Sequence, residues 1–277
     1  MKVQTAYPPG VPCWVETLQP DPRAALGFYS ALFGWEGIGP GPMPNGGEYF
    51  VARLHGDDVA GIATLPPGGA AKPAWTTYVC VDELEASVRR VLAAGGRVIV
   101  APSDAQPAGR FAIVEDPNGA ALGLWEPGSR KGAQRINEPS AWAMSALLAR
   151  DVQAATSFYA TVFGWNAEPF DAGGARGFLF RLPGYVGGTA EQPVPRDVVA
   201  AAIQNDDGTG ADQWSVDFWI DDVDAAVARV ARRGGAVIAA PFDAAVFRRA
   251  VIADPAGAVF SISQLVLERL RADTVAQ

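Results

Sequence analysis

Two carboxylates are the first candidates for chemistry, because each lies inside an apolar, strand-like run. Glu16 occurs in C-W-V-E-T-L and Asp217 in W-S-V-D-F-W. A carboxylate that faces an apolar interior must be paired with a cation, be protonated, or interact with a ligand or substrate. We therefore expect Glu16 or Asp217 to serve as a general base, as the counter-charge of a cationic ligand, or as half of a structural ion pair. The candidate partners for such a pair are Arg53, Arg110 and Arg181.

Metal-binding side chains are scarce in the chain. The single histidine, His55 in R-L-H-G-D-D, is typical of an exposed hairpin turn. A catalytic metal usually needs about three convergent protein ligands, commonly histidine with aspartate or glutamate. The pairs Asp57-Asp58 and Asp206-Asp207 leave a carboxylate-only magnesium or calcium site open, although acidic pairs in turns are normally solvated. We therefore expect neither a metal nor another cofactor.

Other signatures of catalysis are missing from the sequence. Cys13 and Cys80 lack zinc-type spacing, and we expect both to be reduced packing residues. The segment from Gly39 to Gly47 has no Lys-Ser or Lys-Thr after its glycines, so it is interpreted as a loop rather than a phosphate site. Neither a nucleophile elbow nor a cysteine–histidine arrangement is visible.

Length and charge narrow the class of protein. The chain has 277 residues, of which 49% are hydrophobic and 19% charged, and this is typical of a globular protein with two domains. Its net charge of −8 disfavours a nucleic-acid partner. Its first residues lack the apolar region of a signal peptide, and no apolar run approaches the roughly 20 residues that span a bilayer. We expect a cytoplasmic protein without a membrane partner.

An internal repeat divides the chain. The segment F-Y-S-A-L-F-G-W from Phe28 returns as F-Y-A-T-V-F-G-W from Phe158. The segment W-T-T-Y-V-C-V-D from Trp75 likewise returns as W-S-V-D-F-W-I-D from Trp214. These repeats predict a tandem duplication with a first domain over residues 8–127, a linker over 128–139 and a second domain over 140–267.

Caps and spacing predict four helices. Each candidate begins at an aspartate and ends at a glycine, and the four cover residues 21–34, 82–95, 151–164 and 221–234. In the second of them, Asp82 and Glu85 resemble a capping box. Its apolar face is predicted to comprise Leu84, Val88, Val91 and Leu92.

Strand-like runs surround these helices. In the first half they cover residues 13–18, 49–54, 59–65, 76–81, 97–102, 111–115 and 121–125. Each half therefore holds two strand–helix–strand–strand–strand units, four in the whole chain. This order predicts an α+β fold in which helices cover one face of a curved, mostly antiparallel sheet and the other face closes around a cup.

The order of these motifs resembles the vicinal oxygen chelate superfamily, which includes glyoxalase I, bleomycin-resistance proteins and extradiol dioxygenases. The resemblance rests on the F-Y-x-x-x-F-G-W helices, on the helix that ends at Gly95-Gly96, and on the D-P-N-G and D-P-A-G turns at Asp116 and Asp254. It covers almost the whole chain. It implies two tandem domains, each of two paired βαβββ modules around a cup.

The resemblance also implies where metal ligands would lie. In metal-dependent members each module contributes one ligand from its first strand and often a glutamate from its last. None of the matching positions in this chain is histidine, aspartate or glutamate: they are Trp14, Gly61, Thr76, Gly123, Met144, Ala201, Ser215 and Ser261. The metal chemistry of the family is therefore expected to be absent.

Strand alternation extends these positions to a set of pocket residues. The candidate ligand-binding residues are Trp14, Glu16, Thr76, Tyr78, Trp125, Met144, Ser215, Asp217, Trp219 and Ser261. The alternative is that the aromatic side chains simply fill the cups. The glycines at 61 and 123 favour open space, because they remove bulk where a sealed core needs it. The first half, with Glu16 between Trp14 and Leu18, looks the more elaborated.

Three functions fit this pattern. The first is a metal-free protein of the bleomycin-resistance type, which sequesters a drug or metabolite, and its ligand would be a small organic molecule that is aromatic or cationic. The second is a metal-independent lyase, isomerase or hydroxylase-like tailoring enzyme with Glu16 or Asp217 as proton carrier. The third is a scaffold with vestigial cups. Both a monomer and a homodimer are compatible with the duplicated chain.

Overall fold

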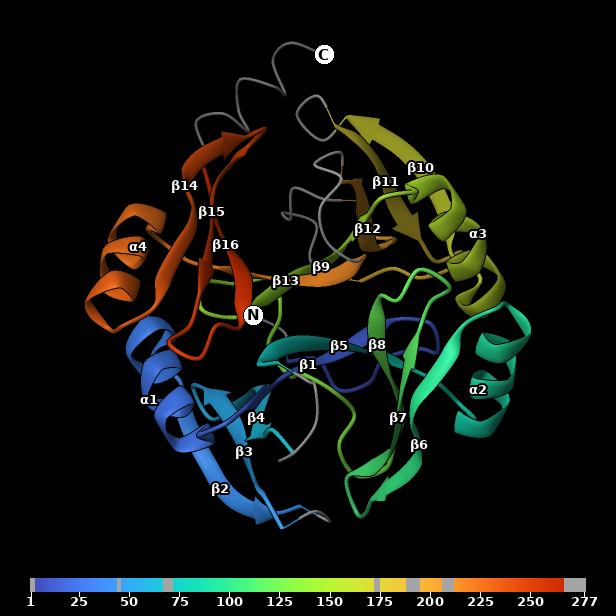
Figure 1. Cartoon of the computed structure of the whole chain (residues 1–277), viewed down its shortest axis with the longest axis horizontal. Coiled ribbons are helices and arrows are strands. Elements are labelled where there is room, and N and C mark those ends of the chain that lie inside the picture. Colours follow the sequence, from blue (N-terminus) through green and yellow to red (C-terminus); the bar gives the residue numbers. More distant parts are fainter. Residues whose placement is uncertain are drawn as a thin grey trace.

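The computed structural model describes residues 3–43, 46–66, 72–171, 175–187, 195–205 and 212–266. Two domains of the same architecture lie against each other, the first in blue to green and the second in yellow to red (Figure 1). Each domain is one eight-stranded sheet with two helices on its outside. The predicted α+β fold of four strand–helix–strand–strand–strand modules is confirmed.

The first domain contains two such modules. Their elements are β1 (Pro12–Gln19), α1 (Pro22–Phe33), β2 (Glu36–Pro42), β3 (Glu48–Leu54), β4 (Asp57–Thr64), β5 (Ala74–Cys80), α2 (Leu84–Ala93), β6 (Arg97–Ala105), β7 (Gly109–Glu115) and β8 (Ala121–Pro127). The second domain repeats them as β9 (Trp142–Ala149), α3 (Val152–Phe163), β10 (Asn166–Asp171), β11 (Arg176–Arg181), β12 (Val198–Gln204), β13 (Gln213–Trp219), α4 (Val223–Arg232), β14 (Ala236–Ala244), β15 (Phe247–Ala253) and β16 (Val259–Leu265).

Both sheets have the same strand order. It is β2-β3-β4-β1-β5-β8-β7-β6 in the first domain and β10-β11-β12-β9-β13-β16-β15-β14 in the second. The first strands of the two modules pair antiparallel at the centre of each sheet, β1 with β5 and β9 with β13. Each of these strands also pairs in parallel with the last strand of its own module. All other pairs are antiparallel, so each sheet is mostly antiparallel, as predicted.

The predicted ends of α1 are confirmed. The Asp21 side chain accepts hydrogen bonds from the N–H groups of Arg23 and Ala24, and Gly34 ends the helix with a φ of 75°. A left-handed φ of this kind favours glycine, which has no Cβ to clash. Asp151 and Gly164 play the same parts in α3.

The predicted capping box of α2 is wrong. The cap residue is Glu83, which makes no side-chain cap bond, and the Leu84 N–H instead donates to Glu126 Oε2 of β8 at 2.7 Å. A neighbouring strand therefore supplies the acceptor that local sequence spacing assigned to Asp82. Leu92 was also misplaced, since it is 51% exposed and does not belong to the apolar face.

The interpretation of Gly39 to Gly47 as a loop is wrong for its first part. Strand β2 extends to Pro42 and pairs antiparallel with β3, with a register shift between Ile38 and Gly41. Glycine and proline weaken strand signals in a sequence, but both are tolerated in an edge strand with a bulge. Because β2 is the outermost strand of its sheet, its composition is compatible with pairing on one side only.

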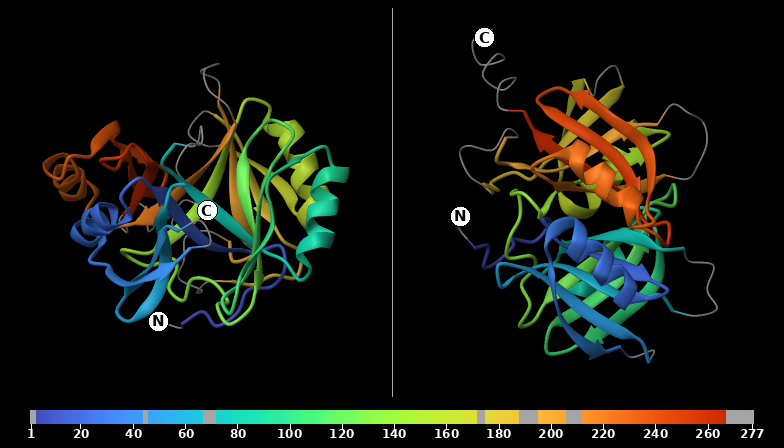
Figure 2. Two further views of the ribbon diagram at one scale, coloured as in Figure 1. Left: turned by 60° about the horizontal axis from the view of Figure 1, so that its bottom comes forward. Right: turned by 90° about the vertical axis from the view of Figure 1, so that its left-hand side faces the viewer.

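The two domains share their apolar cores. Helix α1 packs beside α4, and α2 beside α3, at opposite ends of the domain boundary (Figures 1 and 2). The ring centroids of Phe33 and Phe218 lie 5.1 Å apart, and those of Tyr29 and Phe260 lie 5.7 Å apart, so side chains of α1 pack among those of β13 and β16. The second core joins α2, β7 and β8 to α3 and β9 in the same way.

The repeated motifs meet across this boundary. Tyr29 Oη donates to Asp254 Oδ2 at 2.8 Å, and Tyr159 Oη donates to Asp116 Oδ2 at 2.9 Å. The other oxygen of each aspartate accepts backbone N–H groups of its own D-P turn. The F-Y helix of each half thus binds the D-P turn of the other half, which explains why both motifs occur twice.

Candidate functional site

The register of the sheets aligns the two cups residue by residue. In the first cup one row of neighbours is Gly61–Glu16–Thr76 and the next is Trp14–Tyr78–Gly123. In the second cup the matching rows are Ala201–Ala146–Ser215 and Met144–Asp217–Ser261. Glu16 therefore corresponds to Ala146, and Tyr78 corresponds to Asp217.

The first cup is filled by its own side chains. Tyr78 Oη donates to Glu16 Oε1 at 2.5 Å, and Tyr49 Oη donates to Glu16 Oε2 at 3.1 Å. Trp14 Nε1 donates to Tyr49 Oη at 3.2 Å, and the Trp14 ring is buried. Burial raises the pKa of the Glu16 carboxyl, and the two tyrosine hydroxyls oppose that shift. This arrangement satisfies a half-buried carboxylate without a cation.

The glycines of the first cup accommodate tyrosine rings rather than an external ligand. A Cβ on Gly61 would lie 2.3 Å from Tyr49 Oη, and one on Gly123 would lie 2.1 Å from Tyr78 Cδ1. Real Cβ atoms do not approach other heavy atoms so closely. The missing bulk at these two positions therefore does not leave open space, contrary to the prediction from sequence.

The linker covers the first cup. Trp125 Nε1 donates to the backbone oxygen of Arg130 at 3.0 Å. The Arg130 guanidinium lies 5.4 Å from the centroid of the Trp14 ring, within the range of a cation–π contact, and also binds Asp58. Trp14, Glu16, Tyr78 and Trp125 of the candidate set are thus parts of a packed interior.

Among the described residues, the side chains of the second cup leave it open. It encloses a cavity of about 490 Å³, a size typical of sites for small organic molecules. The aromatic side chains that line it are Trp142, Phe170, Tyr185, Trp219, Phe242 and Phe247. The lining also includes a further aromatic residue, Tyr7, and Val11 from the N-terminal segment, Pro12 at the start of β1, and Ile136 and Asn137 of the linker.

A small polar cluster lies in this apolar cavity. Asp217 Oδ1 accepts hydrogen bonds from Ser263 Oγ at 2.8 Å and from Arg249 Nη2 at 3.2 Å. Burial raises the pKa of the Asp217 carboxyl, while the charge of Arg249 and the bond from Ser263 oppose the shift. The Asp217 side chain is 13% exposed and that of Arg249 is 29% exposed. A carboxylate with a raised pKa beside a guanidinium can accept a hydrogen bond or a proton from a molecule in the cavity.

The structure separates the candidate residues into three groups. Met144, Ser215, Asp217 and Trp219 line the open cavity, together with Ala146, Ala201 and Ser263 from the same sheet faces. Ser261 is buried next to Asp217 in the sheet row and does not line the cavity. The first-cup residues, including the half-buried Thr76, lie in the other domain.

Arg249 is the polar residue that sequence reasoning missed. It is paired with Ser263 across β15 and β16. Alternation along F-R-R-A-V places Phe247, Arg249 and Val251 on one face, so the strand pattern could have placed it in the cup once the register with β16 was known.

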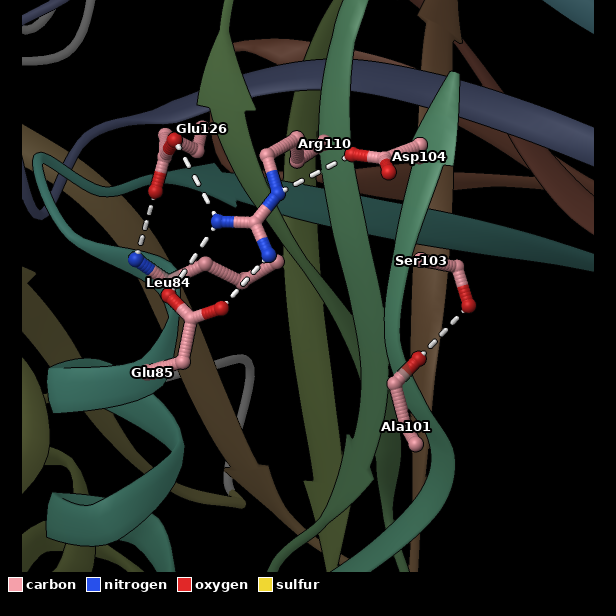
Figure 3. A network of polar contacts seen from close by, with 7 residues as sticks. All are labelled: Leu84, Glu85, Ala101, Ser103, Asp104, Arg110 and Glu126. Atoms are coloured by element: carbon pink, nitrogen blue, oxygen red, sulfur yellow. Dashed lines mark hydrogen bonds and ion pairs between the residues drawn. The ribbon is translucent and has the colours of Figure 1, made fainter.

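None of the three arginines proposed as partners contacts Glu16 or Asp217. Arg53 pairs with Asp58, and Arg181 pairs with Glu168 and Asp197. Arg110 of β7 bridges Glu85 of α2, Asp104 of β6 and Glu126 of β8, as Figure 3 shows. Glu126 also accepts the Leu84 N–H, so this network fixes the start of α2 against the sheet.

The residues present do not fit the metal site of the family. In the open cup the matching positions carry Met144, Ala201, Ser215 and Ser261, and no three histidine, cysteine, aspartate or glutamate side chains converge in the described ranges. His55 is exposed in the turn between β3 and β4. Asp57 pairs with Arg135, and Asp58 with Arg53 and Arg130. Asp206 and Asp207 lie outside the described residues.

Both cysteines are free and buried, in agreement with the packing role predicted for them. Among the helices of the described ranges, none is long and apolar enough to cross a membrane.

Comparison with known proteins identifies both halves. Residues 14–124 match the family described as Glyoxalase/Bleomycin resistance protein/Dioxygenase superfamily, and residues 141–263 match the family described as Glyoxalase-like domain. The chain is 37% identical over 268 residues to "Putative glyoxylase CFP32" of Mycobacterium tuberculosis, covering 95% of this chain and 97% of that one. It is 34% identical over 276 residues to "Anthracycline biosynthesis protein DnrV" of Streptomyces peucetius, covering 94% of this chain and 95% of that one.

Solved structures share the fold at low sequence identity. The Mn(II)-bound glyoxalase from Novosphingobium aromaticivorans has a TM-score of 0.60 at 18% identity and covers 92% of this chain and 82% of its own. The 2,3-dioxygenase LapB from Pseudomonas sp. KL28 has a TM-score of 0.61 at 14% identity and covers 92% and 91%. On its paired βαβββ modules and these matches, the chain belongs to the glyoxalase/bleomycin resistance protein/dioxygenase superfamily, that is, to the vicinal oxygen chelate fold family, as a member with two tandem domains.

Proposed function

We propose that the protein binds a small, flat, mostly apolar organic molecule in the cup of the second domain without using a metal. The observation that carries this proposal is the aromatic-lined cavity of about 490 Å³, in a chain whose other cup is filled. Flat aromatic walls favour a flat aromatic ligand, because stacked and edge-to-face contacts add to apolar burial.

The charges of the cup favour a neutral ligand over a cationic one. Asp217 is already paired with Arg249, so the polar cluster carries little net charge. Glu16, the other candidate counter-charge, accepts two tyrosine hydroxyls inside the filled cup. The similarity to proteins named for anthracycline biosynthesis supports an aromatic polycyclic compound as the ligand class.

Sequestration is the simplest use of such a cup. A ligand held between aromatic walls is removed from solution, as in drug or metabolite protection of the bleomycin-resistance type. Each cup is built within one chain, so a monomer suffices for this function. The net charge of −8 supports our proposal that nucleic acid is not a partner.

The test uses a probe that reports on the cavity alone. 2-Methoxynaphthalene is flat, neutral and unable to donate a hydrogen bond, and equilibrium dialysis measures its binding. Ala146→Trp places an indole in the open cup and is expected to abolish binding, whereas Glu16→Gln at the corresponding position of the first cup leaves binding unchanged. Failure of the wild-type protein to bind, or equal binding by Ala146→Trp, refutes the proposal.

Native mass spectrometry of protein purified from its host, with metal analysis on the same sample, would identify the natural ligand.

A second candidate function is a metal-independent enzyme, in which Asp217 accepts a proton from the bound molecule. The specific observation in its favour is a carboxyl with a raised pKa inside the cavity, beside Arg249 and Ser263. Conversion of the natural ligand by the wild-type protein, lost in Asp217→Asn while binding persists, would support the enzyme. Recovery of the ligand unchanged from both proteins would support sequestration.

A further inference from the structure

Among the described residues, one carboxylate oxygen of Asp217 has no partner. Oδ1 accepts both hydrogen bonds of the cluster, from Ser263 and Arg249. Oδ2 takes part in no hydrogen bond with the described residues and is not fully buried, and the Asp217 side chain lines the cavity. A carboxylate oxygen can only accept, and a group that meets Oδ2 must therefore donate a hydrogen bond.

The first cup contains the complementary arrangement within the protein. There a carboxylate, Glu16, accepts the phenolic hydroxyls of Tyr78 and Tyr49, whose rings fill the space. In the second cup the sheet register places a carboxylate, Asp217, where Tyr78 stands, and a methyl group, Ala146, where Glu16 stands. Among the described residues, no tyrosine hydroxyl donates to Asp217 as Tyr78 and Tyr49 donate to Glu16, although Tyr7 and Tyr185 line the cavity.

Resting on the proposed binding function, we propose that the ligand of the second cup is a planar aromatic molecule with a phenolic hydroxyl that donates to Asp217 Oδ2. Its ring packs against Trp219 and Phe247, whose own ring centroids lie 6.4 Å apart. Ser263 and Arg249 act as positioning residues, because both hold Oδ1 and thereby direct Oδ2 into the cavity.

Selectivity follows from the chemistry of an unpaired carboxylate oxygen. A ligand without a hydroxyl covers Oδ2 with apolar atoms and removes its access to water without supplying a donor. Hydrogen bonds to charged groups are stronger than those between neutral groups. A carboxylate oxygen that is buried without a donor loses its hydrogen bonds to water and gains none in return. A phenol is therefore expected to bind at least tenfold more tightly than the matching methyl ether.

Equilibrium dialysis of 2-naphthol and 2-methoxynaphthalene tests this preference. At about pH 7.5 the naphthol is neutral, like other phenols. Asp217→Asn turns its amide nitrogen toward the cavity, because Arg249 and Ser263 both need an acceptor and engage the amide oxygen. The tenfold preference is expected to fall below threefold in this variant, because the amide nitrogen cannot accept the phenolic hydroxyl and no longer penalises the ether.

Two controls keep the test decisive. The double variant Asp217→Leu with Arg249→Met removes both charges together, so it leaves no unpaired buried ion, and it should bind the two probes equally. Tyr78→Phe removes a phenol from the first cup and should retain the wild-type preference.

The possible outcomes separate the two proposals. If the wild-type protein binds both probes equally, or if Asp217→Asn retains the tenfold preference, the hydroxyl contact is refuted although the cavity still binds aromatic compounds. If the wild-type protein binds neither probe, both proposals fail together.

Discussion

The two cups have the same strands, register and helix positions, yet one is solid and the other is hollow. The difference arises from four pairs of residues, and in each pair the first cup has the larger member. Trp14, Glu16, Tyr49 and Tyr78 of the first cup correspond to Met144, Ala146, Gly177 and Asp217 of the second. Duplication has thus allowed one domain to become a packed support and the other to keep a cavity.

The first prediction concerns the side chains that fill the first cup and their contribution to the free energy of unfolding. Trp14→Ala deletes a buried indole from a packed interior, and we expect it to lower the free energy of unfolding by about 3–5 kcal/mol. Met144→Ala at the corresponding position lines an existing cavity, so it opens no new enclosed space and should cost about 1 kcal/mol. Urea denaturation of the two variants checks the contrast, and equal losses would contradict the assignment of one solid and one hollow cup.

The two tyrosine–aspartate contacts between the domains also differ. Tyr159→Phe leaves Asp116 Oδ2 without a donor, whereas after Tyr29→Phe the oxygen Asp254 Oδ2 still accepts from Gln19 Nε2 at 2.7 Å. An unsatisfied buried oxygen costs about 1–3 kcal/mol. We therefore expect Tyr159→Phe to be the more destabilising by about 1 kcal/mol, again by urea denaturation.

The fold could be predicted from sequence because its signals are local. Asp21, Gly34 and the repeated F-Y and D-P motifs mark the ends of elements by their own chemistry, and the structure confirms the modules that they predict. The cap of α2 could not be predicted, because Glu126 reaches Leu84 from a strand far along the chain.

The state of each cup was harder to infer than the fold. Gly61 and Gly123 look like open space in a sequence, and only the positions of the Tyr49 and Tyr78 rings show that they are filled. The partner of Asp217 depends on the register between β15 and β16, which no local motif encodes. Side chains that fill or line a cavity are therefore determined by tertiary packing.

A pH titration distinguishes the half-buried Glu16 from ordinary surface carboxyls. Burial raises its pKa in the folded state above the unfolded value, so folding favours the protonated form. The stability that this proton contributes is complete below the unfolded pKa of about 4.3 and is lost as the pH rises through the raised folded pKa.

The glutamine in Glu16→Gln cannot titrate. The difference between this variant and the wild type therefore isolates the pH-dependent stability that Glu16 contributes. We expect its melting temperature relative to the wild type to rise with pH from about pH 4 until the folded-state pKa is passed, and then to level off. Thermal melts in matched buffers measure the difference. A difference that is independent of pH would show that Glu16 titrates as it does in the unfolded chain.

The smallest contrast concerns the helices that cover the two sheets. Glu126 accepts the Leu84 N–H at 2.7 Å and is the side-chain cap of α2, whereas Gln264 accepts the Val223 N–H at 3.1 Å in α4. Helix α4 has a second cap, because Asp222 accepts from Ala225 N–H, and α2 has no equivalent from its own cap residue. We expect Glu126→Ala to cost about 1–2 kcal/mol and Gln264→Ala about 0.5 kcal/mol. Hydrogen exchange of the first-turn amides should accelerate more in α2 than in α4, and an equal or larger acceleration in α4 would contradict the greater importance of the Glu126 cap.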